Sequence, residues 1–242
     1  MVTNVPHPRV RSVLLSRLAN KPPGSSQGEI LGELRRCILD GEVPPGSPIP
    51  VDGVAAAFGV SRIPVREALM TLIGEGLVDH RAHTGYRVAR LTAAEFGEIY
   101  LVREVLETAA LRVAVGLADA GDDDQARAAH AALAAAVVAG DGRAHHRESR
   151  RFHLALIKPC RMSRLLHMLS MAWNMTESLQ PMSHLDVTER ELLHRDHAGM
   201  LAAFIARDVD ALIEVCAAHH HRLQSCIARL PRDTGLFAEP AG

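Results

Sequence analysis

The sequence of 242 residues has no uncharged apolar run that approaches the roughly 18 to 20 residues of a membrane-spanning helix. Even the alanine-rich stretch 126–140 carries Arg127 and His130. The first residues, MVTNVPHPRVRSVLLSRL, lack both a sustained apolar stretch and the small-residue cleavage site of a secretory signal. Both absences predict a soluble, cytoplasmic protein.

Cysteine is also scarce. The four cysteines show neither CxxC spacing nor the density of a disulfide framework. We therefore expect reduced and mostly buried thiols at Cys37, Cys160, Cys216 and Cys226.

The net charge is only −1, which gives the chain no general attraction to nucleic acid, so its distribution is more informative than its sum. Residues 1–90 hold 11 Lys and Arg against 8 Asp and Glu, a net of +3, and the remainder holds 16 against 20, a net of −4. The hydrophobic content of 48% is too high for a chain that is disordered throughout. We expect two folded units, with a modest basic excess in the first.

Helix-ending residues divide the first third of the chain. Residues 1–27 end in the cluster NKPPGSSQG, which predicts a flexible N-terminal segment with at most one short helix. Apolar residues at helical spacing predict helices near 28–40 and 51–58, and Ser61 is expected to cap a third helix.

Two short strands are expected after the third helix, near 77–81 and 86–90. The turn that joins them contains His83, Thr84 and Gly85. Three helices followed by a β-hairpin predict a winged helix-turn-helix over residues 28–91.

The third helix is expected to bury one stripe and to expose its first turn. With Ser61 as N-cap, Pro64 lies in the first turn, where its missing N–H breaks no helical hydrogen bond. The residues left to project outward are Ser61, Arg62, Ile63 and Arg66. Two arginines at the positive end of a helix dipole are unfavourable unless an external anion meets them, and phosphate is the obvious candidate.

Beyond Thr92 the pattern is almost purely helical. The expected helices lie near 93–119, 122–139, 142–157, 162–179, 187–206 and 208–230. No strand signal competes, which predicts an all-α bundle over 92–232 and a C-terminal tail at 233–242.

The first unit resembles the GntR family of bacterial transcriptional regulators in its motifs I-x-D-G-x-x-P-P-G, GVSRIPVREAL and L-x-x-E-G-L-V, and in its glycine-containing wing. The resemblance implies a homodimer on a palindromic DNA operator, with the third helix in the major groove, the wing in the minor groove, and Arg62 and Arg66 on DNA. Many relatives carry a basic residue where this chain has Asp52. In the structural alternative, the arginines only pair with Glu67 or Glu75.

Eleven of the fourteen histidines lie between residues 130 and 221, and most are expected at the surface. His197 and His219 flank a turn near residues 206–208 at about ten and eleven residues, so antiparallel helices bring them to one level. With His153 on another helix, three imidazoles could hold a divalent transition metal, zinc or nickel. Consecutive helical residues diverge by 100°, so of His219-His220-His221 only His219 is favoured by register.

The helical unit resembles the FadR-like subfamily with an FCD effector domain. The resemblance rests on VREVLETAALRVA at 102–114, the F-H pair at 152–153, HRDHAGMLAAFIARD at 194–208, and a histidine 22 residues after His197. It implies dimerisation and a small-molecule effector, an organic acid by analogy, bound in this domain.

The resemblance also bears on the metal. Metal-binding members carry Asp or Asn four residues before the first histidine, where this chain has Ser149. The histidines therefore hold a metal, line a metal-free ligand pocket, or hydrogen-bond to one another. Ser149 and Arg103 are candidate effector contacts, Arg103 through a carboxylate, although a salt bridge from Arg103 to Glu107 is an equal alternative.

Three functions compete at this point. A ligand-responsive regulator would change the spacing of its DNA heads on effector binding, which requires unequal effector affinity for two states. A metal-dependent hydrolase needs a general base, yet HExxH and paired carboxylates are missing near the histidines. An architectural DNA-binding protein would use the helical domain only to dimerise, and would bind no metabolite.

Overall fold

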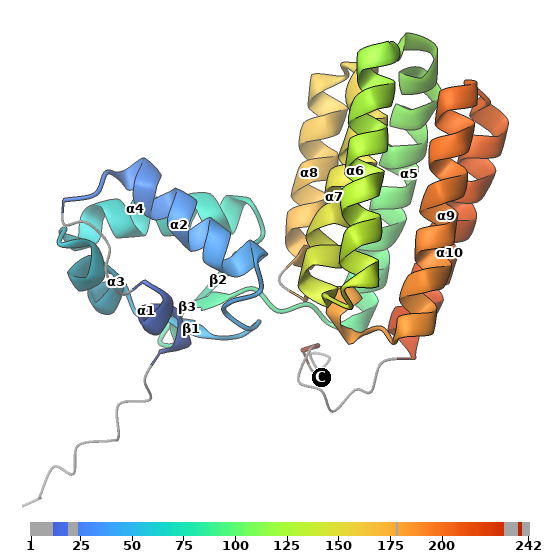
Figure 1. The fold of residues 1–242 in the computed structure, drawn as a ribbon. Coiled ribbons are helices and arrows are strands. Elements are labelled where there is room, and N and C mark those ends of the chain that lie inside the picture. Colours follow the sequence, from blue (N-terminus) through green and yellow to red (C-terminus); the bar gives the residue numbers. More distant parts are fainter. Residues whose placement is uncertain (1–11, 19–23, 178, 230–236, 239–242) are drawn as a thin grey trace, which may run out of the picture. The chain divides into compact units, whose positions relative to one another are not determined.

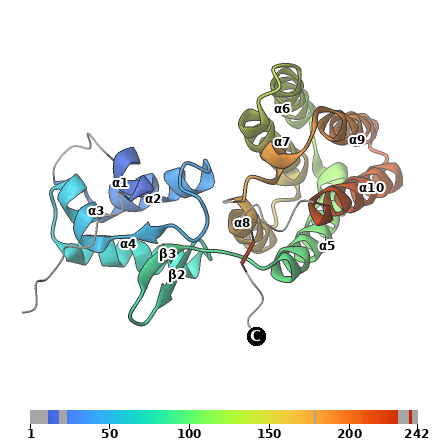
Figure 2. The same ribbon diagram turned by 90° about the horizontal axis from the view of Figure 1, so that it is seen from below.

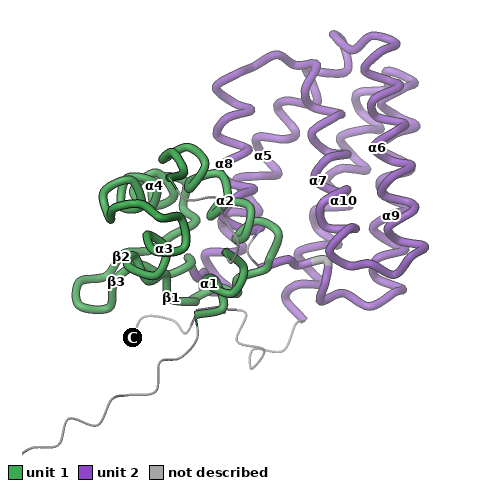
Figure 3. Tube along the Cα trace, turned by 60° about the vertical axis from the view of Figure 1, so that its left-hand side comes forward, with its two compact units in different colours: residues 1–89 green, residues 90–242 purple. Residues whose placement is uncertain are grey.

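The structure is a computed structural model, and it describes residues 12–18, 24–177, 179–229 and 237–238. The chain divides into two compact units, residues 1–89 and residues 90–242 (Figure 3). The expected fold class, a winged helix-turn-helix followed by an all-α bundle, is confirmed. In the described part of the chain, no helix is long and apolar enough to cross a membrane.

The first unit is built from four helices and a small sheet (Figure 1). Its elements are α1 (Val13–Arg17), α2 (Gln27–Leu39), β1 (Pro48–Ile49), α3 (Val51–Phe58), α4 (Arg62–Gly74), β2 (Val78–Arg81) and β3 (Gly85–Val88). The sheet is antiparallel with the order β1-β3-β2. The sequence predicted the hairpin of β2 and β3, but not the short strand β1.

Local chemistry sets the helix ends of this unit. Ser26 and Glu29 form a reciprocal capping box at the start of α2. Gly59 ends α3 in the left-handed conformation, with φ at 63°.

The whole segment 1–27 was expected to be flexible or loosely docked, with at most one short helix. Residues 1–11 and 19–23 lie outside the described residues, but helix α1 within the segment is packed rather than loose. Leu14 and Leu18 are buried in the same core as Leu34 and Leu69, because two leucines one turn apart give α1 an apolar edge.

The second unit is a bundle whose long helices run side by side in Figure 1 and are seen nearly end-on in Figure 2. Its helices are α5 (Ala93–Leu117), α6 (Ala120–Val138), α7 (Gly142–Ile157), α8 (Ser163–Glu177), α9 (Val187–Ala206) and α10 (Val209–Ala228). Two short 3-10 helices, η1 (Lys158–Cys160) and η2 (Pro181–His184), flank α8. Of the predicted tail 233–242 only residues 237–238 are described, and Phe237 packs edge-on against Phe96.

Most of these helices begin at a residue whose side chain accepts a hydrogen bond from the first turn. These N-caps are Thr92, Asp119, Asp141, Asp186 and Asp208. Helix α5 packs against α7, α8 and α10 and therefore turns its buried stripe into the centre of the bundle.

Candidate functional site

The start of α4 exposes the side chains that the sequence predicted as DNA contacts. Ser61, Arg62, Ile63 and Arg66 are all exposed, and Ile63 keeps 67% of its surface accessible. The opposite stripe of the helix is buried through Val65, Ala68, Leu69 and Leu72. Burial on one side thus fixes the exposed turn on the other.

Two details of this turn differ from expectation. Ser61 holds the N-cap position, but its side chain makes no capping hydrogen bond, so its hydroxyl is left for another partner. Arg62 forms an ion pair with Asp52 of α3, and both side chains are about two-thirds exposed. The alternative pairing of Arg62 or Arg66 with Glu75 is wrong, since Glu75 binds Arg35 of α2 at 2.8 Å from Nε.

The wing is a tight hairpin between β2 and β3. His83 and Gly85 both have positive φ, 67° and 76°, in the left-handed region that glycine adopts freely and histidine adopts more often than most residues. His83 and Thr84 are exposed at the tip, and Gly85 is half-buried. Tyr86 stacks on His80 across the strands, with ring centroids 4.5 Å apart.

In the helical unit, the three predicted metal-binding histidines come together. His153 of α7, His197 of α9 and His219 of α10 each offer a ring nitrogen, and these atoms lie within 4.8 Å of one another. His153 Nε2 and His197 Nε2 are 3.2 Å apart. Ser149 joins them through its hydroxyl, 3.4 Å from His197 Nε2.

A neighbouring carboxylate orients one of the three rings, and a second lies near another ring. His153 Nδ1 donates to Glu107, which leaves the lone pair of Nε2 directed at the cluster. His219 Nδ1 lies 3.7 Å from Asp196. Burial, together with the other histidines, lowers the pKa of His197 well below its usual value, and burial lowers the pKa of His219 to about 4 against the opposing effect of Asp196. Both imidazoles are therefore neutral at pH 7, the form that binds metals.

The expectation that most of the histidines in the helical unit are at the surface is wrong. Six of the eleven are buried: His145, His146, His153, His197, His219 and His220. Buried imidazoles are tolerated here because several of them share partners with one another or with buried carboxylates. His220, which register arguments set aside, is among them and donates to Glu107 at 3.0 Å.

Glu107 is the residue of this site that sequence reasoning missed. It is fully buried and accepts from His153 through one oxygen and from His220 through the other. Burial alone would raise its pKa, but the two histidines outweigh burial and hold the pKa of Glu107 well below its usual range. Glu107 therefore pairs with His153 and His220, and not with Arg103 as in the alternative.

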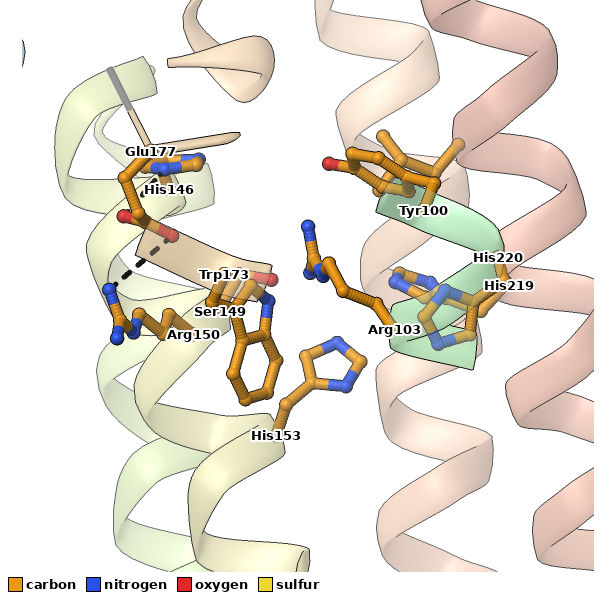
Figure 4. Close-up of a pocket in the computed structure, with 11 residues that line it drawn as sticks. Tyr100, Arg103, His146, Ser149, Arg150, His153, Trp173, Glu177, His219 and His220 are labelled. Carbon is orange, nitrogen blue, oxygen red and sulfur yellow. Dashed lines mark hydrogen bonds and ion pairs between the residues drawn. The ribbon is translucent and has the colours of Figure 1, made fainter. Parts of the chain in front are cut away.

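A small, partly open cavity lies beside the histidines, and Arg103 extends into it (Figure 4). The cavity measures about 20 Å³, room for about one water molecule. Arg103 is 7% exposed, donates to Thr176 at 3.2 Å, and its guanidinium lies 4.4 Å from the ring centre of Tyr100 and 5.0 Å from that of Trp173. Arg103 Nε has no partner among the described residues.

The wall opposite to Tyr100 carries a second charged group (Figure 4). Glu177 accepts from His146 at 2.9 Å and lies 3.8 Å from Arg150. Burial opposes ionisation of Glu177, but His146 and then the two arginines lower its pKa. The cavity thus combines a buried guanidinium, a buried carboxylate and several imidazoles, among them the neutral ring of His219.

A winged helix-turn-helix joined to a helical domain with an internal polar cavity defines a DNA-binding transcriptional regulator rather than an enzyme. Residues 26–88 match the family described as bacterial regulatory proteins, gntR family, and residues 98–222 match the FCD domain. The chain belongs to the GntR family of transcriptional regulators and carries an FCD effector-binding domain.

Individual relatives agree with this assignment. The transcriptional regulator YdhC of Bacillus subtilis is 35% identical over 38% of this chain, and the match covers only 41% of that regulator. The transcriptional repressor RspR of Escherichia coli K12 is 25% identical over 83% of this chain and 88% of its own. The solved structures of E. coli McbR/YncC and of a GntR regulator from Rhodococcus sp. RHA1 share the fold, each with a TM-score of 0.75, at 21% and 23% identity. Each alignment covers 85% of this chain, with 98% and 99% of the respective structures.

Proposed function

We propose that this protein is a ligand-responsive regulator that binds a palindromic operator as a homodimer. The binding of an organic acid to the helical domain raises or lowers its affinity for DNA. The proposal rests mainly on Arg103, a buried guanidinium whose Nε has no partner among the described residues and which lies beside buried histidines. A buried cation of this kind favours a ligand carboxylate, which can accept two parallel hydrogen bonds from it. The cavity has room for about one water molecule, so it must widen to admit the rest of the acid. Ser149, at the edge of the same cavity, offers the ligand a hydroxyl.

The three-histidine cluster fits a divalent transition metal. Two of the imidazoles are held neutral, and His153 directs Nε2 at the cluster because its Nδ1 is bonded to Glu107. When bound, a zinc or nickel ion would supply positive charge and open positions for the carboxylate of the effector. Ser149 replaces the carboxylate or amide side chain of metal-binding relatives, so the protein contributes no negative charge as a direct ligand here and leaves that role to the effector acid.

Removal of one histidine tests the metal. His197→Ala is expected to lower bound zinc by about one equivalent per chain, measured by elemental analysis after dialysis of the full-length protein, because a two-imidazole remnant binds zinc much more weakly. His167→Ala, which removes an exposed histidine of α8, is the matched control and should leave the zinc content unchanged. Equal zinc in the wild type and His197→Ala would contradict the assignment.

The outer face of α5 supports a dimer. Leu101, Val102 and Val105 are 48–60% exposed, and Ala109 and Val113 extend the same exposed apolar face, which spans about 120° of the helix. The face runs for about 18 Å along the helix, and a second copy of the chain can bury it with an identical face.

A charge placed on this face should separate the protomers. Val105→Asp is expected to shift the full-length protein toward a monomer in sedimentation velocity, because an isolated carboxylate would be buried at the interface. Val138→Asp is the control, since Val138 is 89% exposed on α6, away from this face. An unchanged sedimentation coefficient in Val105→Asp would exclude this face.

The regulatory part of the proposal is tested on DNA from the region upstream of the coding sequence. Small carboxylic acids are first screened for those that raise the melting temperature of the full-length protein. Each such acid should then change operator affinity, measured by fluorescence anisotropy, by roughly the 5- to 150-fold typical of coupling between sites. Equal operator affinity with and without a stabilising acid would contradict the switch.

A further inference from the structure

A second group of metal-ligating side chains lies next to the three-histidine cluster. Glu107 of α5 and Cys216 and His220 of α10 are buried, with exposed fractions of 0, 0 and 1%. Each offers one ligand atom, and the three atoms lie within 4.8 Å of one another. We propose that Glu107, Cys216 and His220 form a second binding site for a thiophilic divalent metal ion such as zinc.

The backbone positions suit chelation. Cys216 and His220 are four residues apart, so they lie one above the other on the face of α10 that packs against α5. His220 Nε2 lies 3.0 Å from Glu107 Oε2. Two ligands about 2.0 to 2.2 Å from a tetrahedral zinc ion are roughly 3.3 to 3.6 Å apart. A small increase in the distance between His220 Nε2 and Glu107 Oε2 therefore makes room for an ion in place of the proton that they share.

Charge balance gives the second reason. Glu107 is a fully buried carboxylate whose two hydrogen-bond partners are imidazoles, and an ionised group in a protein interior needs a compensating charge. A divalent ion bound by the Glu107 carboxylate, the Cys216 thiolate and a neutral His220 forms a group with no net charge. An ion bound by the three imidazoles of the first cluster would instead keep its full positive charge. That charge suits a site that binds the effector acid.

The two sites are connected through Glu107. One of its oxygens contacts His153 Nδ1, and the other faces His220. An ion in the second site would hold this carboxylate in the orientation that directs His153 Nε2 toward the first site. We therefore assign the second site a structural role, distinct from the effector cavity.

Cobalt(II) titration of the reduced, chelator-treated, full-length protein tests the proposal. The wild type should bind about two equivalents and develop a thiolate-to-cobalt charge-transfer band in the near ultraviolet. Cys216→Ala should lose the band together with about one equivalent. Cys160→Ala removes another buried free cysteine and should keep both. His197→Ala should lose the other equivalent and retain the band, which separates the two sites.

Two outcomes would overturn the second site. One is a wild-type protein that saturates with cobalt and shows no thiolate band. The other is a band that persists in Cys216→Ala. Far-ultraviolet circular dichroism checks that each variant is folded, and the wild-type spectrum decides the matter even if Cys216→Ala does not fold.

Discussion

The double substitution Arg62→Ala/Arg66→Ala is expected to weaken operator binding by at least about 30-fold. Each arginine that binds a guanine edge contributes about 1–3 kcal/mol of discrimination, so two contribute about 2–6 kcal/mol, or roughly 30- to 20,000-fold. Both side chains are exposed on the first turn of α4, so their removal costs the fold little. Fluorescence anisotropy across a salt series measures the loss.

The salt series separates two modes of contact. Arginines that only neutralise phosphates would lower the slope of log K against log salt by about 0.9 each when removed, with equal losses on operator and unrelated DNA. Base-reading arginines would reduce mainly the preference for the operator. Arg127→Ala removes an exposed arginine of α6 and is the matched control. Unchanged operator affinity in the double variant would refute the assignment of α4 as the DNA-reading helix.

Glu107→Leu is expected to destabilise the metal-free helical unit by about 2–6 kcal/mol, because two buried ring N–H donors lose their acceptor at about 1–3 kcal/mol each. Leucine is larger than glutamate, so the loss does not come from a cavity. His153 and His220 would each lose the acceptor of a ring N–H. Urea unfolding followed by the fluorescence of Trp173, the single tryptophan of the chain, reports on this unit alone.

Helix α5 provides the control for this experiment. Glu98→Ala, at an exposed position, should change the unfolding free energy by no more than about 0.5 kcal/mol. A loss in Glu107→Leu no greater than that of Glu98→Ala would mean that the carboxylate is dispensable for stability.

The DNA-binding unit could be predicted from local sequence because local chemistry determines it. Pro64 and Gly59 mark helix ends, and the alternation of buried and exposed positions fixes which side of α4 is free. The ion pair of Arg62 with Asp52 could not be predicted in the same way, because it depends on how α3 and α4 cross.

The effector cavity was predictable only in part. Equal distances from one turn brought His197 and His219 together, as simple helix geometry requires. Glu107 was missed, although Arg103, Glu107 and Ala110 share the helical spacing of one buried stripe. A charged residue on an otherwise apolar stripe signals a buried partner, but the partner's identity depends on the rotation of α7 and α10 about their axes, which periodicity does not give.

The ion pair between Asp52 and Arg62 bears on how the protein searches a genome. DNA that binds Arg62 must first break its ion pair with Asp52. For an exposed ion pair this costs about 0–1 kcal/mol. A single phosphate offers little more than Asp52 does, whereas a guanine edge offers two hydrogen bonds in fixed geometry. The pair therefore offsets most of what Arg62 could gain from a single phosphate, whereas a guanine contact of about 1–3 kcal/mol would still leave a net gain.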